Sequence, residues 1–170
     1  MFSQGVIAYL LPLHIQTLGY DSRLSGTLMS TFGIVAVLIF VLPTNRIFDR
    51  VASSKTTAIG IGLMGLSQLL ISQSSTSLAL YFVLGLYGVG FGFLFPSINT
   101  MLIKATPKEL RGKAYGYFYA FFSLGVVAGS SVLGWLHFSI IEGFIFTGII
   151  LLLFAAFVAF DKQRDYALNH

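Results

Sequence analysis

The chain has 170 residues, of which 56% are hydrophobic and only 9% are charged. A soluble domain carries about one quarter charged residues because its surface faces water, so this composition excludes an ordinary soluble globule and favours a membrane protein. The net charge is +4, but no basic patch with interleaved aromatic residues is present, so we expect no nucleic-acid partner. Without cysteine, and with three scattered histidines, we also expect no disulfide, metal site or cofactor.

Apolar runs separated by short polar links follow one another along the whole chain. Each run is close to the length of about 20 residues that a helix needs to cross a bilayer, and no link is long enough to form a soluble domain. We therefore expect an all-α membrane protein with one bundle of transmembrane helices over residues 1–160 and a polar cytoplasmic tail at 161–170. The six expected transmembrane segments are about 4–19, 24–45, 56–73, 77–103, 113–136 and 141–160.

The distribution of positive charge predicts how these segments are oriented. Lysine and arginine gather in cytoplasmic loops of membrane proteins. If the N-terminus is cytoplasmic and the loops alternate, every lysine and arginine except Arg23 lies on the inner side. This bias supports the division into six segments independently of hydropathy. It predicts a protein integral to the plasma membrane, with both termini in the cytoplasm.

The stretch "ATPKELRGKAYGYF" at 105–118 concentrates charge between two apolar runs. We interpret it as a cytoplasmic elbow. Thr106 is placed to cap the following helix, Pro107 suits its first position, and Glu109 completes a capping box. Arg111 would hold the entry of this helix at the anionic leaflet. A charged turn that only separates two membrane helices explains part of the same pattern.

Three stretches of the sequence match known motifs. "NRIFDRVASSK", with Asp49 and Arg50 as an Asp-Arg pair, resembles the Asp-Arg loop between the second and third helices of each half of major facilitator superfamily transporters. "GVGFGFLFPSINTMLIKATPKELRGKAYGYFYAFFSLGVVAG" is similar to helices ten and eleven of drug and metabolite exporters. "GVVAGSSVLG" resembles the antiporter motif, although Ser130 replaces its proline and Leu133 one of its glycines.

The resemblance implies a specific architecture. Members of this family consist of two six-helix halves, each built from inverted three-helix repeats. This chain is similar to one half, and its motifs favour the carboxyl-terminal half, from a truncated or a split gene. The resemblance also implies that Asp49, Arg50, Glu109 and Arg111 belong to gating loops. In that role Asp49 would bind a helix N-terminus or pair with Arg111, while a solvated charged loop is the alternative.

Candidate path residues are polar and aromatic. Tyr115, Tyr119 and Phe122 follow helical spacing and share one face, which would line a substrate path or form the inner aromatic belt. Asn99 would line the path or bond a neighbouring helix, because an unpaired amide in hydrocarbon costs several kcal/mol. Gln4 and Tyr9 are weaker candidates.

Small residues are expected to mediate helix packing. A stripe beginning with Gly112 and Gly116 lies beside the aromatic face and suits close packing. The other glycines that we expect at helix contacts are Gly88, Gly92, Gly125 and Gly129.

The pattern as a whole favours a secondary transporter over an enzyme. No paired acids or histidine cluster lie at membrane depth, and no nucleophile has a neighbouring base. We expect one half of a twelve-helix carrier that moves a small organic solute by alternating access, with proton-coupled export implied by the family. Its partners would be the lipid bilayer, the solute and a second half or second copy of the chain. The alternative is a truncated, non-transporting remnant or a scaffold that binds other helices.

Overall fold

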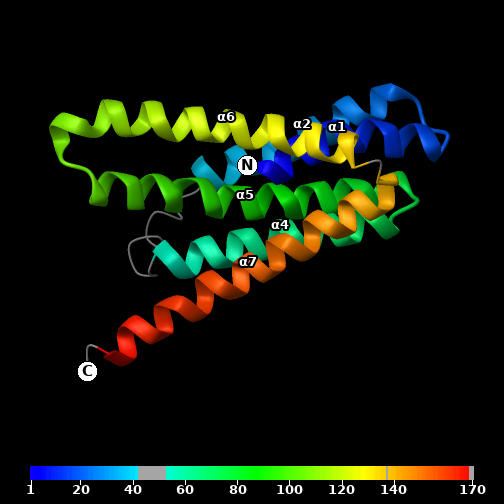
Figure 1. Ribbon diagram of the computed structural model, residues 1–170. Coiled ribbons are helices and arrows are strands. Elements are labelled where there is room, and N and C mark those ends of the chain that lie inside the picture. Colours follow the sequence, from blue (N-terminus) through cyan, green and yellow to red (C-terminus); the bar gives the residue numbers. More distant parts are fainter. Residues whose placement is uncertain (42–52, 137, 169–170) are drawn as a thin grey trace.

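The computed structural model describes residues 1–41, 53–136 and 138–168, and this part of the chain is helical without any strand (Figure 1). The expectation of an all-α protein is therefore confirmed. The short 3-10 helix η1 covers Lys108–Leu110. The α-helices are α1 (Phe2–Thr17), α2 (Ser22–Val41), α4 (Ser53–Gln73), α5 (Ser77–Ala105), α6 (Arg111–Trp135) and α7 (Ile140–Leu168). Helix α7 continues to Leu168 and so includes most of the expected tail.

Among the described residues, 4 helical stretches are long and apolar enough to cross a membrane: Ser22–Val41, Ser77–Ala105, Lys108–Trp135 and Ile140–Phe160. Helix α1 has only 16 residues, or about 24 Å at 1.5 Å per residue, which is less than a hydrocarbon core of about 30 Å. Helix α4 has 21 residues, but serine, threonine, glutamine and glycine lower its apolar character.

Helix α4 lies between α5 and α7 and packs closely on both. A Cβ atom on Gly60 would lie 2.7 Å from the carbonyl oxygen of Gly90 in α5. On the other side, a Cβ atom on Gly65 would lie 3.0 Å from the carbonyl oxygen of Gly148 in α7. Glycine at these crossings lets the backbones approach more closely than larger residues would.

The pattern of helix contacts is similar when the first three helices, α1, α2 and α4, are exchanged in order with the last three, α5, α6 and α7. Helix α1 packs on α6, and the corresponding pair after the exchange, α5 and α2, also packs together. The contact of α4 with α5 corresponds in the same way to that of α7 with α1, and the contact of α4 with α7 corresponds to itself. Three helix contacts thus match between the two three-helix units, whereas the contact of α1 with α2 has no counterpart of similar extent between α5 and α6.

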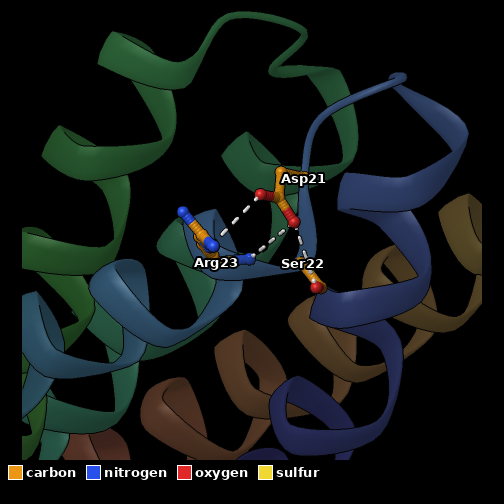
Figure 2. Close-up of polar contacts among 3 residues, drawn as sticks. All are labelled: Asp21, Ser22 and Arg23. Atoms are coloured by element: carbon orange, nitrogen blue, oxygen red, sulfur yellow. Dashed lines mark hydrogen bonds and ion pairs between the residues drawn. The ribbon is translucent and has the colours of Figure 1, made fainter.

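The reversal between α1 and α2 is specified by a glycine and an aspartate. Gly19 has φ +79°, and the backbone N–H groups of Gly19 and Tyr20 donate to the carbonyls of Gln16 and Ile15. This is a Schellman motif, which ends a helix at a residue with positive φ. Asp21 then starts α2, because its carboxylate accepts hydrogen bonds from the Ser22 hydroxyl and the Arg23 backbone N–H (Figure 2). The Asp21–Arg23 ion pair, at 3.6 Å, is exposed.

A capping box occurs at a different helix from the one expected. Helix α6 begins at Arg111 without a side-chain cap, and Pro107 precedes the separate turn η1. The prediction that Thr106 and Glu109 form a capping box was therefore wrong, because the proline starts a 3-10 turn instead of the α-helix. The actual capping box begins α7: the Ser139 N–H donates to Glu142 Oε2 at 2.9 Å, and the Glu142 N–H donates to Ser139 Oγ at 3.3 Å.

Candidate functional site

A buried polar cluster joins α1, α4 and α5. The hydroxyl oxygens of Ser3 and Tyr87 are 2.8 Å apart and share a hydrogen bond. The side-chain amide of Gln68 donates to Ser3 Oγ at 2.7 Å and to the Ser3 carbonyl at 3.1 Å. Exposure is 1% for Ser3 and Tyr87 and 0% for Gln68. Sequence reasoning missed these residues, because hydroxyl and amide side chains on separate helices give no spacing that reveals their contact.

Aromatic rings extend from this cluster toward the loop between α5 and α6. The ring of Tyr87 contacts Phe32 of α2, and successive ring pairs then cross α2, α5 and α6. The centroids of neighbouring rings in this row are 5.3 to 6.5 Å apart. We call these residues the aromatic row: Phe32, Phe40, Tyr87, Phe91, Phe95 and Phe118.

Tyr115, Tyr119 and Phe122 continue the aromatic row on α6. The rings of Tyr115 and Tyr119 are stacked with centroids 6.3 Å apart, and Tyr119 and Phe122 are 6.4 Å apart. Phe118 contacts both Tyr119 and Phe122, which connects this face of α6 to Phe95 of α5. The Tyr119 side chain is 50% exposed, so the face is open on one side.

Asn99 lies one turn after Pro96 in α5 and bonds its own helix. Its Nδ2 atom donates to the Phe95 carbonyl at 3.1 Å, and its buried Oδ1 atom has no hydrogen-bond partner. Ser97 and Thr100 likewise donate to carbonyls of the preceding turn. Such bonds from short polar side chains bend helices. Among the residues that the structure describes, the Asn99 amide therefore makes no hydrogen bond to a neighbouring helix.

The weaker candidates of α1 lie on different sides of that helix. Gln4 is partly buried, and its side chain makes no hydrogen bond among the described residues. Tyr9 is exposed, and a Cβ atom on Gly134 of α6 would lie 3.7 Å from the Tyr9 hydroxyl. The structure thus places Tyr9 beside α6 and separates both residues from the polar cluster.

The loop residues for which a gating role was expected are only partly described. Asp49 and Arg50 lie outside the described residues. Glu109 is exposed at the turn η1. Arg111 donates from Nε to the Thr106 carbonyl at 3.5 Å and from a terminal nitrogen to the Ile103 carbonyl at 3.4 Å. Its guanidinium therefore binds carbonyls at the C-terminal end of α5, where a positive charge is favourable.

The glycines expected at helix contacts lie at two crossings. Gly88 and Gly92 of α5 face α2, where added Cβ atoms would lie 2.7 Å from the Phe32 carbonyl oxygen and from Ile39. Gly125 and Gly129 of α6 face the first residues of α1.

The stripe that begins at Gly112 and Gly116 behaves differently. Added Cβ atoms there would meet nothing within 4 Å. The expectation that it packs closely was therefore wrong for these two glycines among the described residues, because α1 begins opposite Gly125 and the amino-terminal half of α6 extends beyond that point. The described residues also contain no group of three metal-ligating side chains.

Comparison with known proteins identifies the family to which the chain belongs. The model of the Major Facilitator Superfamily matches residues 1–168. The chain belongs to this superfamily. The resemblance drawn from the loop and glycine motifs is thereby confirmed at the level of the family, which assigns the chain to the transporters and not to the enzymes.

Several curated relatives are similar to most of the chain. The multi-drug resistance efflux pump PmrA of Streptococcus pneumoniae is 29% identical over 140 residues, which are 78% of this chain and 35% of the pump. Multidrug resistance protein 2 of Bacillus subtilis is 27% identical over 166 residues, 97% of this chain and 41% of that protein. A probable chloroplastic anion transporter 3 of Arabidopsis thaliana is 29% identical over 114 residues, 66% of this chain and 22% of that protein. The chain thus spans well under half the length of these relatives.

Proposed function

We propose that the chain forms one six-helix half, of the carboxyl-terminal type, in a twelve-helix carrier that moves small organic solutes across the plasma membrane by alternating access. The observation that carries this proposal is the superfamily match over residues 1–168, together with relatives more than twice as long. In this assignment α2, α4, α5, α6 and α7 cross the bilayer and the carboxyl terminus is cytoplasmic. Helix α1, with 16 residues, covers only about 24 Å of a sixth crossing, with its first residues toward the cytoplasmic side. The matching contacts of the two three-helix units support the inverted repeats that such halves contain.

A second half has exposed apolar surface available to it. Alternating access requires one bundle to move against another around a site near the midplane, and one six-helix half supplies only one wall. Val37 and Val41 of α2 and Phe121 and Leu124 of α6 are exposed apolar side chains. The open stripe at Gly112 would give a partner helix a close approach. We propose that the second half, or a second copy, covers these surfaces.

The roles of the loops and of the path follow from this assignment. Asp49, Arg50, Glu109 and Arg111 would act at the cytoplasmic gate, with Arg111 fixing the end of α5. Tyr115, Tyr119, Phe122 and Asn99 would line the inner part of the path, and Gln4 and Tyr9 its side toward α1. Export is proposed from the similarity to an efflux pump, and proton coupling is proposed only from the resemblance to the exporters of the superfamily. A non-transporting remnant or helix-binding scaffold is the second candidate.

Flux from vesicles separates the two candidates. The chain would be reconstituted as single copies, as a tandem fusion of two copies and together with a separate six-helix half, with ethidium as the probe. The carrier proposal predicts ethidium flux only where two six-helix units are joined or associated, and loss of this flux with a protonophore. No flux from any of the three preparations, with the protein correctly inserted, would support the remnant instead.

Replacing Tyr119 with alanine tests the proposed path. Tyr119 contacts Tyr115, Phe118 and Phe122, and its exposed side offers an aromatic face to a flat or cationic solute. We expect Tyr119→Ala to weaken ethidium binding by about 5- to 30-fold, equivalent to 1–2 kcal/mol for a lost cation–π or stacking contact. Fluorescence titration of the fused protein would measure the affinity. Tyr117→Ala is the matched control, because Tyr117 is 69% exposed and contacts none of these rings; equal losses would exclude a path at Tyr119.

A further inference from the structure

The polar cluster of Ser3, Gln68 and Tyr87 lies near the middle of the bundle. At 1.5 Å per residue, Ser3 is about 16 Å along α1 from His14, which bonds Ser74 at the end of α4. Tyr87 is about 16 Å along α5 from its capping residue, Thr76. Both distances correspond to roughly half of a hydrocarbon core of about 30 Å. Polar groups at this depth cannot exchange their hydrogen bonds with bulk water.

The hydrogen bonds of the cluster leave one acceptor and one donor unused. The Oε1 atom of Gln68 is buried without a partner. Rotating the amide would place this oxygen against the Ser3 carbonyl, so the two bonds from Nε2 fix its orientation. The hydroxyls of Ser3 and Tyr87 share a single hydrogen bond, so one of their two hydrogens has no acceptor within the cluster. When Ser3 donates to Tyr87, the unused hydrogen belongs to the Tyr87 hydroxyl, and bringing this hydroxyl to Gln68 Oε1 would satisfy both unused groups.

The backbone of α1 is coupled more tightly to α6 than to the rest of the cluster. A Cβ atom on Gly129 would overlap the backbone carbonyl of Phe2 and lie 3.1 Å from the backbone nitrogen of Val6. Gly5 approaches the backbone of Val126 in the same way. Contacts between α6 and α5 are few by comparison. A movement of α1 away from α4 and α5 would therefore carry α6 with it and would also open the contacts of α1 with α2 and α7.

We propose that Gln68 is a positioning residue whose side chain holds α1 in one state and Tyr87 in another. In the state described, Ser3 binds both Gln68 and Tyr87. When α1 and α6 withdraw together, Ser3 leaves the cluster and the Tyr87 hydroxyl donates to Gln68 Oε1. The exchange keeps at least one hydrogen bond to the Gln68 side chain in each state. The Gln68 amide is therefore never left without a partner in the interior. This inference rests on the proposed alternating access, because it identifies a hydrogen-bond exchange that accompanies the movement.

Two conservative substitutions distinguish this exchange from a static contact. Ser3→Ala removes hydrogen bonds only from the state described, so it shifts the population toward the withdrawn state. Membrane hydrogen bonds of this kind predict a shift of about three- to tenfold. Tyr87→Phe removes one hydrogen bond from each state, so the ratio of states changes by less than about twofold. Ser67→Ala is the control, because Ser67 is also fully buried but bonds only the Leu63 carbonyl of its own helix.

The populations can be read without any transport assay. The chain has no cysteine, so spin labels at Ala8→Cys in α1 and Phe82→Cys in α5, both exposed positions, report one distance in lipid nanodiscs. The proposal expects two distances between the labels, one for each state. Ser3→Ala should increase the population that has the second distance, whereas Tyr87→Phe and Ser67→Ala should leave that population nearly unchanged. A single distance in every variant, or equal shifts from Ser3→Ala and Tyr87→Phe, overturns it. A carrier that transports ethidium yet shows a single distance refutes the exchange alone, whereas two distances without flux refute the proposed function.

Discussion

Gly129→Ala is expected to cause a large loss of stability by separating α6 from α1. The added methyl group would overlap the backbone carbonyl of Phe2 and lie 3.1 Å from the Val6 backbone nitrogen. Backbone atoms cannot rotate away as a flexible side chain can, so the helices must move apart. Overpacking of this kind costs about 1–3 kcal/mol, and we expect the upper end because the obstacle is backbone. Unfolding of the chain in mixed micelles, followed by circular dichroism at increasing denaturing detergent, measures the change.

Gly116→Ala supplies the control on the same helix. A Cβ atom there would meet nothing within 4 Å, so no packing is lost. Alanine favours a helix over glycine by roughly 0.5–1 kcal/mol in water, so the variant should be as stable as the parent or slightly more stable. Equal losses of stability in the two variants would show that the effect of Gly129→Ala does not come from its contact with α1. Unchanged stability for Gly129→Ala would contradict the close approach of α1 and α6.

The periodicity of the chain predicted the helices more accurately than their ends. Apolar runs bounded by polar links located every α-helix of the described part, because hydrocarbon allows a continuous backbone to satisfy its hydrogen bonds only internally. The ends depended on local competition. Thr106 and Glu109 carry the same capping pattern as Ser139 and Glu142, yet only the second pair forms the box. Pro107 decides the difference, since it begins a 3-10 turn before α6.

The glycines and the polar residues show why a site is harder to predict than a span. Spacing alone cannot distinguish Gly129, which meets a backbone, from Gly116, which meets nothing. The difference arises because α1 begins opposite Gly125, so that Gly129 lies beside α1 and Gly116 does not. Gln68 is likewise an isolated amide in the sequence of α4, and only the packing of three helices brings it to Ser3. Tyr115 and Tyr119 were predictable as neighbours because they lie one turn apart on the same helix.

The aromatic row has a mechanical consequence for α6. Helix α6 packs along α1 through its carboxyl-terminal half, whereas its amino-terminal half is largely exposed. Among the described residues, the ring pair of Phe95 and Phe118, with centroids 6.3 Å apart, links this half to α5. Phe95 also contacts Phe40 of α2 and Phe91 of its own helix. One side chain thus connects α2, α5 and α6 near the loop between α5 and α6.

Phe95→Ala is therefore expected to release the amino-terminal half of α6 as well as to destabilise the bundle. Truncating a buried phenylalanine costs about 3–5 kcal/mol, and the partly buried ring of Phe95 should cost about 2 kcal/mol. Hydrogen exchange resolved by mass spectrometry would show faster exchange over residues 111–122, with 125–135 unchanged because the glycine contacts with α1 remain. Phe121→Ala is the matched control, since Phe121 is 71% exposed on the same helix. Faster exchange in both variants would mean that lipid contacts, and not Phe95, hold this half of α6 in place.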